Sequence, residues 1–503
     1  MGQWVRLGIA MLFIVGIFFA VGIGFESSYL LIIAAMIGGY MAINIGANDV
    51  ANNVGPAVGS GALKLGGAIV IAGLFESAGA LIAGGDVVGT IKSGIINPAL
   101  IADSDTFVWL MMAAMLSGAI WLNLATAFGA PVSTTHSIVG GVLGAGIAAG
   151  GLGIADWHKM GAIVASWVIS PVLGGFIAAG FLYLIKRTVT YKQDRLAAAR
   201  KVVPLLVGLM IWMFSTYLMV KGLKKIWKID ILSALGAGLL IAALVYLVVR
   251  PLIAKATEKM KNDKVSVNRL FTLPLIFAAA LLSFAHGAND VANAVGPLAA
   301  INDALLHGGI ATKAAIPLWV MMIGALGIVV GLALYGPKLI RTVGSEITEL
   351  DQTRAFCTAM AAAITVIVAS QLALPVSSTH IAVGAVFGVG FLREHLKIAY
   401  AQAIHEIERH HQGEDRVIVE EFLHEFEEAP LERQQVMLQQ LKDNSSQAHL
   451  TRAERKSLKK IFREQLVKRS ALYKIATAWV ITVPASGLMA ALLFFAIRAF
   501  MQA

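Results

Sequence analysis

The sequence contains one cysteine, Cys357, and few charged side chains. A single cysteine excludes an intramolecular disulfide, so the fold does not depend on an oxidising compartment, and packing is the expected role of this side chain. Only 14% of the 503 residues are charged, 58% are hydrophobic, and apolar runs of about twenty residues recur along the chain. These values exclude an ordinary soluble domain and predict an all-α polytopic membrane protein.

The sequence also lacks the motifs that a membrane enzyme needs. It has no HExxH zinc motif and no GxSxG nucleophile motif near a histidine. Six of the eleven histidines fall in residues 393–470, but their spacing, as in HEIERHH, matches no ligand set with a known mechanism. We therefore assign no catalytic residue, no metal centre and no cofactor, and we do not expect an enzyme.

The net charge of +10 is distributed unevenly. Residues 393–470 hold 14 acidic and 14 basic side chains, so the apolar remainder carries the whole surplus. Six basic residues lie in 186–202 and six more in 250–269. Basic clusters in short loops beside apolar spans mark the cytoplasmic side of a membrane and do not indicate nucleic-acid binding.

Two polar segments occur twice within the apolar chain. Gly46–Pro56 (GANDVANNVGP) and Gly287–Pro297 (GANDVANAVGP) are identical at ten of eleven positions. Each is followed by a second shared segment, APVSTTHSIVG at Ala130–Gly140 and LPVSSTHIAVG at Leu374–Gly384. The chain is therefore a duplicated unit.

The repeats and the charge pattern together predict the domain organisation. WVISP at Trp167–Pro171 recurs as WVITVP at Trp479–Pro484. The distance in sequence from the histidine of the second shared segment to this tryptophan is longer in the second copy (His380 to Trp479) than in the first (His136 to Trp167), so the second copy contains a charged insert. Apolar residues in the insert have the spacing of amphipathic helices. We expect about 12 membrane segments, divided into an extra N-terminal span (1–28), transport repeat 1 (29–185), basic loops with two spacer spans (186–269), the first part of repeat 2 (270–392), the helical insert (393–470) and the last span of repeat 2 (471–503).

The topology follows from counting spans. If Arg6 keeps the N-terminus inside, repeat 1 starts outside, whereas repeat 2 starts after the basic loop at 250–269 and hence inside. The two repeats are then inverted in the lipid bilayer, as in many secondary transporters. The same count places the insert in the cytoplasm of a multi-pass protein of the inner (plasma) membrane. It leaves four lysines, Lys221, Lys224, Lys225 and Lys228, in a short outer loop.

Proline and hydroxyl residues predict broken or re-entrant helices in each repeat. Gly55–Pro56 and Gly296–Pro297 should interrupt a helix, as should Pro131 and Pro375. The residues after the last two prolines are helix-capping types, and the exposed amides of a helix start attract anions. We expect an anion site formed by Ser133, Thr134 and Thr135 together with Ser377, Ser378 and Thr379.

Three carboxylates lie in otherwise apolar or amide-rich surroundings: Asp49, Asp290 and Glu76. A charge at such a position is costly and by default functional, and beside an anion it requires a cation or a proton. We therefore assign these residues to cation binding and coupling. His136 and His380 are candidates for contact with a proton or with the substrate, or for ordering the adjacent turn.

The asparagines in the first shared segment are the remaining polar candidates. Asparagine in a membrane helix often only bonds to a neighbouring helix, but four of these residues are retained in the duplication and are assigned to the substrate site. They are Asn48, Asn52, Asn289 and Asn293. Asn53 has no counterpart in the second copy, where Ala294 stands, and is interpreted as a packing residue.

GANDVAN occurring twice, followed by PVSTTH or PVSSTH, resembles the inorganic phosphate transporter (PiT) family, which includes the type III sodium-phosphate cotransporters of animals. The resemblance covers both repeats but not the insert. It implies a symporter that moves orthophosphate or a metal-phosphate complex with sodium or protons, or sulfate as in some bacterial members. The resemblance implies that the asparagines, aspartates and hydroxyl residues given above, which match the family's motifs, form the binding site.

Several alternatives stay open at this point. Animal members have intramembrane glutamates in both halves, whereas Pro317 stands opposite Glu76 here, so the coupling ion is open between sodium, which we favour for a cage of hard oxygens, and protons. Phosphate is favoured over sulfate because it keeps a hydroxyl that a carboxylate can accept. A sulfate permease, an anion channel and a membrane enzyme are the alternatives, and a homodimer is compatible with the sequence.

Overall fold

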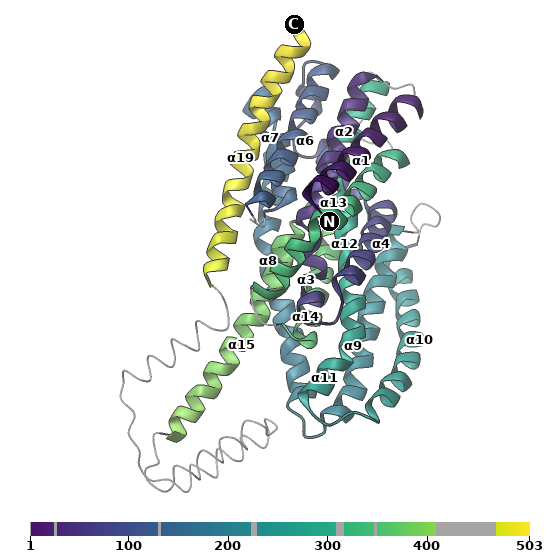
Figure 1. Cartoon of the computed structure of the whole chain (residues 1–503), viewed down its shortest axis with the longest axis vertical. Coiled ribbons are helices and arrows are strands. Elements are labelled where there is room, and N and C mark those ends of the chain that lie inside the picture. The colour runs from purple at the N-terminus through teal and green to yellow at the C-terminus, as the bar shows by residue number, and fades with distance from the viewer. Residues whose placement is uncertain are drawn as a thin grey trace.

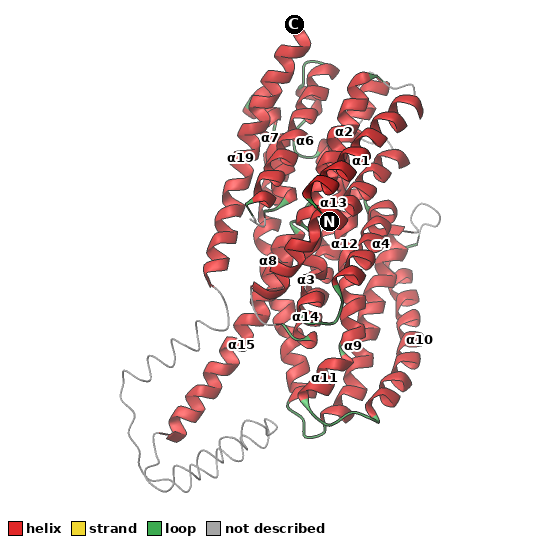
Figure 2. Ribbon diagram, in the orientation of Figure 1, coloured by secondary structure: helices red, strands yellow, loops and turns green. Residues whose placement is uncertain are grey.

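The computed structural model is an elongated bundle of α-helices (Figures 1 and 2). It describes residues 2–24, 28–128, 132–222, 229–307, 316–346, 350–408 and 469–503. Each apolar segment expected from the sequence is helical in this part of the chain, and its only β-contact is the isolated bridge between Ile96 and Ala155. Cys357 is a buried free thiol, in keeping with its expected packing role.

The helices follow the chain in this order: α1 (Gln3–Gly24), α2 (Tyr29–Asn48), α3 (Val50–Gly59), α4 (Leu65–Ala83), α5 (Gly85–Ser93), α6 (Ser104–Ala127), α7 (Thr134–Gly150), α8 (Trp157–Ile185), α9 (Arg195–Tyr217), α10 (Ile231–Thr257), α11 (Lys264–Leu270), α12 (Thr272–His307), α13 (Leu318–Glu346), α14 (Gln352–Gln371), α15 (Ser378–Glu408) and α19 (Arg469–Gln502). Short 3-10 or π-helical turns, η1 to η4, lie at Pro98–Leu100, Leu152–Ile154, Lys186–Thr190 and Leu218–Gly222.

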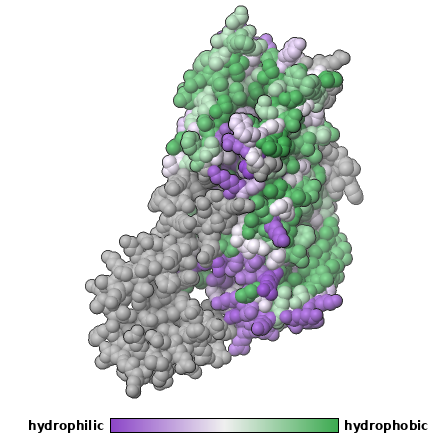
Figure 3. Space-filling view, in the orientation of Figure 1, coloured by the Kyte–Doolittle hydropathy of each residue, from purple (hydrophilic) through white to green (hydrophobic). Residues whose placement is uncertain are grey.

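The bundle has the dimensions and surface of a membrane protein. Eleven helices among the described residues are long and apolar enough to cross a bilayer, close to the 12 segments expected. Where Figure 3 is coloured, hydrophobic residues predominate, and hydrophilic ones gather at the lower end and in a smaller group near the middle. The connection from α10 to α11, one of the basic loops, lies at that end in Figure 1. The chain is therefore a multi-pass membrane protein.

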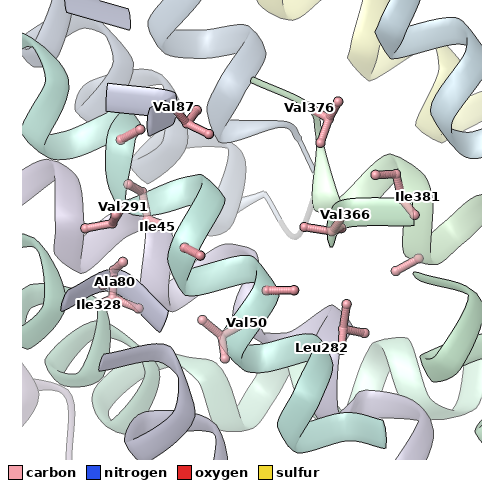
Figure 4. Packing of buried hydrophobic residues seen from close by; sticks show 14 of the residues in the cluster. Ile45, Val50, Ala80, Val87, Leu282, Val291, Ile328, Val366, Val376 and Ile381 are labelled. Carbon is pink, nitrogen blue, oxygen red and sulfur yellow. The ribbon is translucent and has the colours of Figure 1, made fainter. Parts of the chain in front are cut away.

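The two repeats run in opposite directions, and helices of one repeat pack against helices of the other. In Figure 1, α2 starts at the upper end beside the end of α1, whereas α12 starts beside α11 at the lower end. Helix α2 packs on α13 and α12 on α4, and in the same way α7 packs on α19 and α15 on α8. Every pair joins one helix of each repeat, so the core shown in Figure 4 is formed by both copies together.

Glycines at matching positions of the repeats allow these pairs to approach closely. A Cβ added at Gly46 would collide with the carbonyl of Ile328, and one added at Gly287 would collide with that of Glu76. A Cβ added at Gly144 on α7 would collide with the carbonyl of Gly487, and one added at its counterpart in repeat 2, Gly388 on α15, would collide with that of Gly175. Close backbone contact at small residues is what holds helices together where lipid removes the hydrophobic driving force.

This packing gives a first prediction. Gly144→Ala should lower the free energy of unfolding by about 1–3 kcal/mol, because the added methyl meets the α19 backbone and not a movable side chain. Gly161→Ala on α8 is the matched control: no atom lies within 4 Å of its added Cβ, so helix propensity alone should leave it neutral or slightly stabilised. Unfolding of the purified protein in detergent measures both, and equal stabilities would contradict the proposed contact.

The break expected at the Gly-Pro pair of the first polar segment is found in neither repeat. In repeat 1, helices α2 and α3 are separated by Asp49 alone, and Pro56 lies inside α3. In repeat 2, α12 continues without interruption through the second copy, with Pro297 inside it. The prediction of a break there was wrong, because a proline in a membrane helix is tolerated where neighbouring helices satisfy the freed backbone groups.

Among the described residues, Lys92 and Lys221 form ion pairs between helices. Lys92 of α5 contacts Asp303 of α12, with both side chains buried. Lys221, which the span count left on the outer side, contacts Asp86 of α5. Within the charged insert, the structure describes residues 393–408 as the end of α15, and residues 409–468, with His410 and His411, lie outside the described residues.

Candidate functional site

Two helix starts meet inside the bundle, as the prolines and hydroxyl residues predicted. Helix α7 is capped by Ser133, whose Oγ accepts from the His136 amide at 3.1 Å, and α15 by Ser377, whose Oγ accepts from the His380 amide at 3.2 Å. The rings of the two histidines lie 4.4 Å apart between centroids. The partly positive ends of two helices therefore face each other from opposite repeats.

Asp49 connects the two helix starts. Its Oδ2 accepts from the hydroxyl of Thr134 on α7 at 2.6 Å, and its Oδ1 accepts from that of Thr379 on α15 at 3.0 Å. The Asn52 amide donates to the same Thr379 hydroxyl at 2.9 Å. The carboxylate is buried, so it depends on these donors for its solvation.

Asp290 occupies the matching position in repeat 2 with different partners. Its Oδ2 accepts from the hydroxyl of Ser378 at 3.0 Å and lies 3.1 Å from Nε2 of His286, one helical turn earlier on α12. The Asn293 amide donates across to Thr134 and Thr135, each at 3.1 Å. The acidic groups of the two repeats thus share one polar cluster at the helix starts.

A third carboxylate joins this cluster through His286. Nδ1 of His286 lies 2.7 Å from Oε2 of Glu76, and Oε1 of Glu76 accepts from the Asn53 amide at 2.7 Å. The imidazole, with a carboxylate at each nitrogen, is fully buried. Sequence reasoning missed His286, and the interpretation of Asn53 as a packing residue was wrong, because its side chain is a hydrogen-bond partner of Glu76.

The amide oxygens of the four repeated asparagines have no donor among the described residues. These atoms are Oδ1 of Asn48, Asn52, Asn289 and Asn293. The carboxylate oxygen Oδ1 of Asp290 also has no donor there. The amide orientations are fixed where the nitrogen faces an atom that can only accept: Asn52 donates to the backbone carbonyl of Asp49, and Asn289 to that of Leu374. Buried acceptors without donors are costly unless they bind a cation or a ligand.

The site brings together most of the residues assigned from the sequence, with different tasks. Ser133 and Ser377 serve as helix caps. Thr135 donates to the carbonyl of Val376 at 2.9 Å, and Asn48 donates to Thr126 at 3.2 Å. Direct hydroxyl contact with the aspartates is made by Thr134, Ser378 and Thr379.

The ligand atoms of Asp49, His286 and Asp290 all lie within 4.8 Å of one another. Two carboxylates with nearby amide oxygens suit a hard monovalent or divalent cation, for which oxygen ligands are preferred. One imidazole cannot neutralise three carboxylates, so the cluster of Asp49, Asp290 and Glu76 retains negative charge when all three are ionised. An anion can approach these carboxylates only if that charge is balanced.

Comparison with known proteins gives a consistent result. Residues 45–490 match the Phosphate transporter family. A Helicobacter pylori (strain 26695) protein that bears the name "Putative phosphate permease" is 53% identical over 505 residues, covering 98% of this chain and 95% of that protein. A Pyrococcus abyssi protein with the same description is 39% identical, covering 72% of this chain and 89% of that protein. A solved structure titled "The sodium-dependent phosphate transporter" superposes with a TM-score of 0.76 at 30% identity, covering 94% of this chain and all of that one.

Proposed function

The chain belongs to the phosphate transporter family, and from that premise we propose that it imports inorganic phosphate through the plasma membrane by symport with a cation, sodium being the favoured ion. The observation that carries the proposal is the pair of facing helix starts whose hydroxyls donate to two buried aspartates. This arrangement offers donors to an oxyanion and acceptors to a cation within one polar cluster.

Phosphate fits the donor side of the cluster. The first-turn amides of α7 and α15 and the hydroxyls of Thr134, Ser378 and Thr379 are the kinds of group that bind phosphate oxygens at helix N-termini. Near neutral pH phosphate keeps at least one P–OH group, which a carboxylate of Asp49 or Asp290 can accept. Sulfate has no such proton and would leave a buried acceptor unpaired, a difference that reaches roughly four to five orders of magnitude in sites of this kind.

The hydrogen bonds also supply a reason for coupling. A hydroxyl has one proton, so Thr134, Ser378 and Thr379 can donate to phosphate only by leaving the carboxylates to which they now donate. A cation bound to Asp49 and Asp290 would replace those donors and release the hydroxyls for the anion. Cation binding and phosphate binding then each require the other, which is what symport demands.

Sodium is favoured because the unpaired amide oxygens and carboxylate oxygens form an oxygen-rich ligand set. Asp49 and Asp290 can hold the cation, with the amide oxygens of Asn52 and Asn293 completing its ligands. The proton is the second candidate, favoured by His286, whose two nitrogens face Glu76 and Asp290. The sulfate permease remains the alternative substrate class, and it makes the opposite prediction on competition.

Uptake of labelled phosphate into proteoliposomes tests the proposal. An inward sodium gradient should concentrate phosphate above the outside level and a proton gradient alone should not, and dissipating the sodium gradient should release it. Excess arsenate, which keeps the proton, should compete strongly, whereas excess sulfate should leave uptake nearly unchanged. Downhill flux without accumulation would indicate a channel, and equal inhibition by sulfate would overturn the choice of substrate.

A further inference from the structure

A short non-helical segment between α14 and α15, Ala373–Val376, is held by donors on four different helices. The Thr90 hydroxyl of α5 donates to the carbonyl of Ala373 at 2.8 Å, and the Asn289 amide of α12 donates to that of Leu374 at 3.2 Å. The Trp167 indole of α8 donates to the carbonyl of Pro375 at 3.0 Å. The Thr135 hydroxyl of α7 donates to that of Val376 at 2.9 Å. Four successive carbonyls thus each have a side-chain donor.

The amides at the start of this segment are satisfied by the end of α14: Ala373 donates to the carbonyl of Ser370 and Leu374 to that of Ala369, and Ala373 takes the left-handed φ of 54° that is common at such helix ends. The four carbonyls have no such local partner, because no backbone amide among the described residues bonds to them. Non-helical backbone within a membrane bundle must then be paired by side chains. The course of the segment from the end of α14 to the start of α15 therefore depends on its side-chain donors.

Three of the four donors come from the other repeat. Thr90, Thr135 and Trp167 belong to repeat 1, whereas the segment leads directly into Ser377–Thr379, the start of α15 in repeat 2. Thr90 and Trp167 lie outside both shared polar segments. The part of the site contributed by repeat 2 is consequently positioned by repeat 1.

We propose that Thr90 and Trp167 are positioning residues for phosphate binding, which hold Ala373–Val376 so that the start of α15 faces the substrate. The proposal rests on the proposed function, since it assigns these residues to the same anion site. Neither side chain needs to contact phosphate. Loss of Trp167 leaves the buried carbonyl of Pro375 unpaired, and loss of Thr90 leaves the partly buried carbonyl of Ala373 unpaired. Either loss releases the segment that positions the hydroxyls of Ser378 and Thr379.

The duplication provides a matched control for Trp167. Its counterpart, Trp479, stacks on His380 at 3.5 Å between centroids, as Trp167 packs edge-on against His136 at 3.8 Å. Nε1 of Trp479, however, has no hydrogen-bond partner in the described part of the chain. Phenylalanine at either position removes the same atoms and keeps an aromatic ring against a histidine, and only the change at Trp167 removes a hydrogen bond, the one to Pro375.

Phosphate uptake kinetics test the assignment. Trp167→Phe should raise the KM for phosphate by roughly five- to a hundredfold with Vmax retained, the range expected for a buried carbonyl left unpaired. Trp479→Phe should change KM by less than about twofold. Thr90→Val should also raise KM, but by less, because its hydrogen bond to Ala373 is only partly buried, and Thr90→Ser, which keeps the donor, should have the wild-type KM. Equal effects at Trp167 and Trp479, or no effect of Thr90→Val, would overturn the proposal.

A second readout separates this proposal from the proposed function. With Cys357→Ala as background, Leu374→Cys places a single thiol in the segment. Its alkylation by a maleimide should be faster in combination with Trp167→Phe or Thr90→Val and unchanged with Trp479→Phe. If the wild type carried no phosphate while alkylation followed this pattern, the function would fail and the positioning would stand. Unchanged alkylation in all variants would refute the positioning itself.

Discussion

Replacing Asp49 or Asp290 with asparagine should reduce sodium-driven phosphate uptake to about 1% of wild type or less. Each substitution keeps the size of the side chain and removes one of the buried carboxylates to which the hydroxyls of Thr134, Ser378 and Thr379 donate. Truncating one partner of a buried charge interaction costs about 2–5 kcal/mol, which lowers cation affinity by roughly thirty- to several thousandfold. Because the cation must release those hydroxyls, phosphate affinity should fall with it.

The sodium concentration that gives half-maximal uptake is the decisive measurement. This sodium concentration should be much higher in both variants than in wild type. The KM for phosphate, measured at saturating sodium, should also be higher than that of wild type. Asp105→Asn is the control, because this aspartate is exposed in the first turn of α6 and should leave transport unchanged. An unaltered sodium dependence in both site variants would show that these aspartates are not the cation's ligands.

The sequence predicted the helix starts because their causes are local. Pro375 disfavours helical angles at Leu374, and Ser377 is a capping residue two positions later, so α15 begins where the pattern indicated. The duplication then predicted that a second start lies opposite the first. The contact between the His136 and His380 rings is the structural expression of that symmetry.

The sequence could not predict contacts in which the two repeats differ. His286 and Glu76 are 210 positions apart, and their counterparts by alignment of the repeats are Ile45 and Pro317. Neither carries a charge, so comparison of the copies conceals the interaction. The signals were present separately, a glutamate in an apolar run and a histidine four residues before Asp290. Only the fold shows that they meet.

The continuity of α12 was missed for a related reason. The second copy differs from the first at one of eleven positions, yet α2 and α3 are separated at Asp49, which itself keeps helical angles, whereas α12 is continuous in repeat 2. Local sequence cannot account for that difference. His286 lies one turn before Asp290 on the unbroken helix, and this geometry places one nitrogen of the ring near Asp290 while the other reaches Glu76 on α4. The repeats therefore differ in chemistry at this point, because only repeat 2 has a histidine beside its aspartate.

That divergence predicts a second large effect. Glu76→Gln should lower the maximal rate of phosphate uptake by two orders of magnitude or more, because it removes one of the two carboxylates against His286 while the ring stays buried. Breaking a buried ion pair from one side costs about 3–5 kcal/mol. Asn53→Ala removes only a hydrogen bond to Glu76 and should lower the rate less, by roughly ten- to a hundredfold. Glu258→Gln, at an exposed position after α10, is the control.

A double-mutant cycle decides whether Glu76 and His286 act as one unit. His286→Gln alone should be as damaging as Glu76→Gln, since each leaves a buried group without its partner. The combination of both replaces the pair with two neutral amides that can bond to each other, so its loss should be clearly smaller than the product of the single losses. Multiplying losses would mean that the two residues act independently. In that case the charge balance of the site would have to come from Asp49, Asp290 and the cation alone.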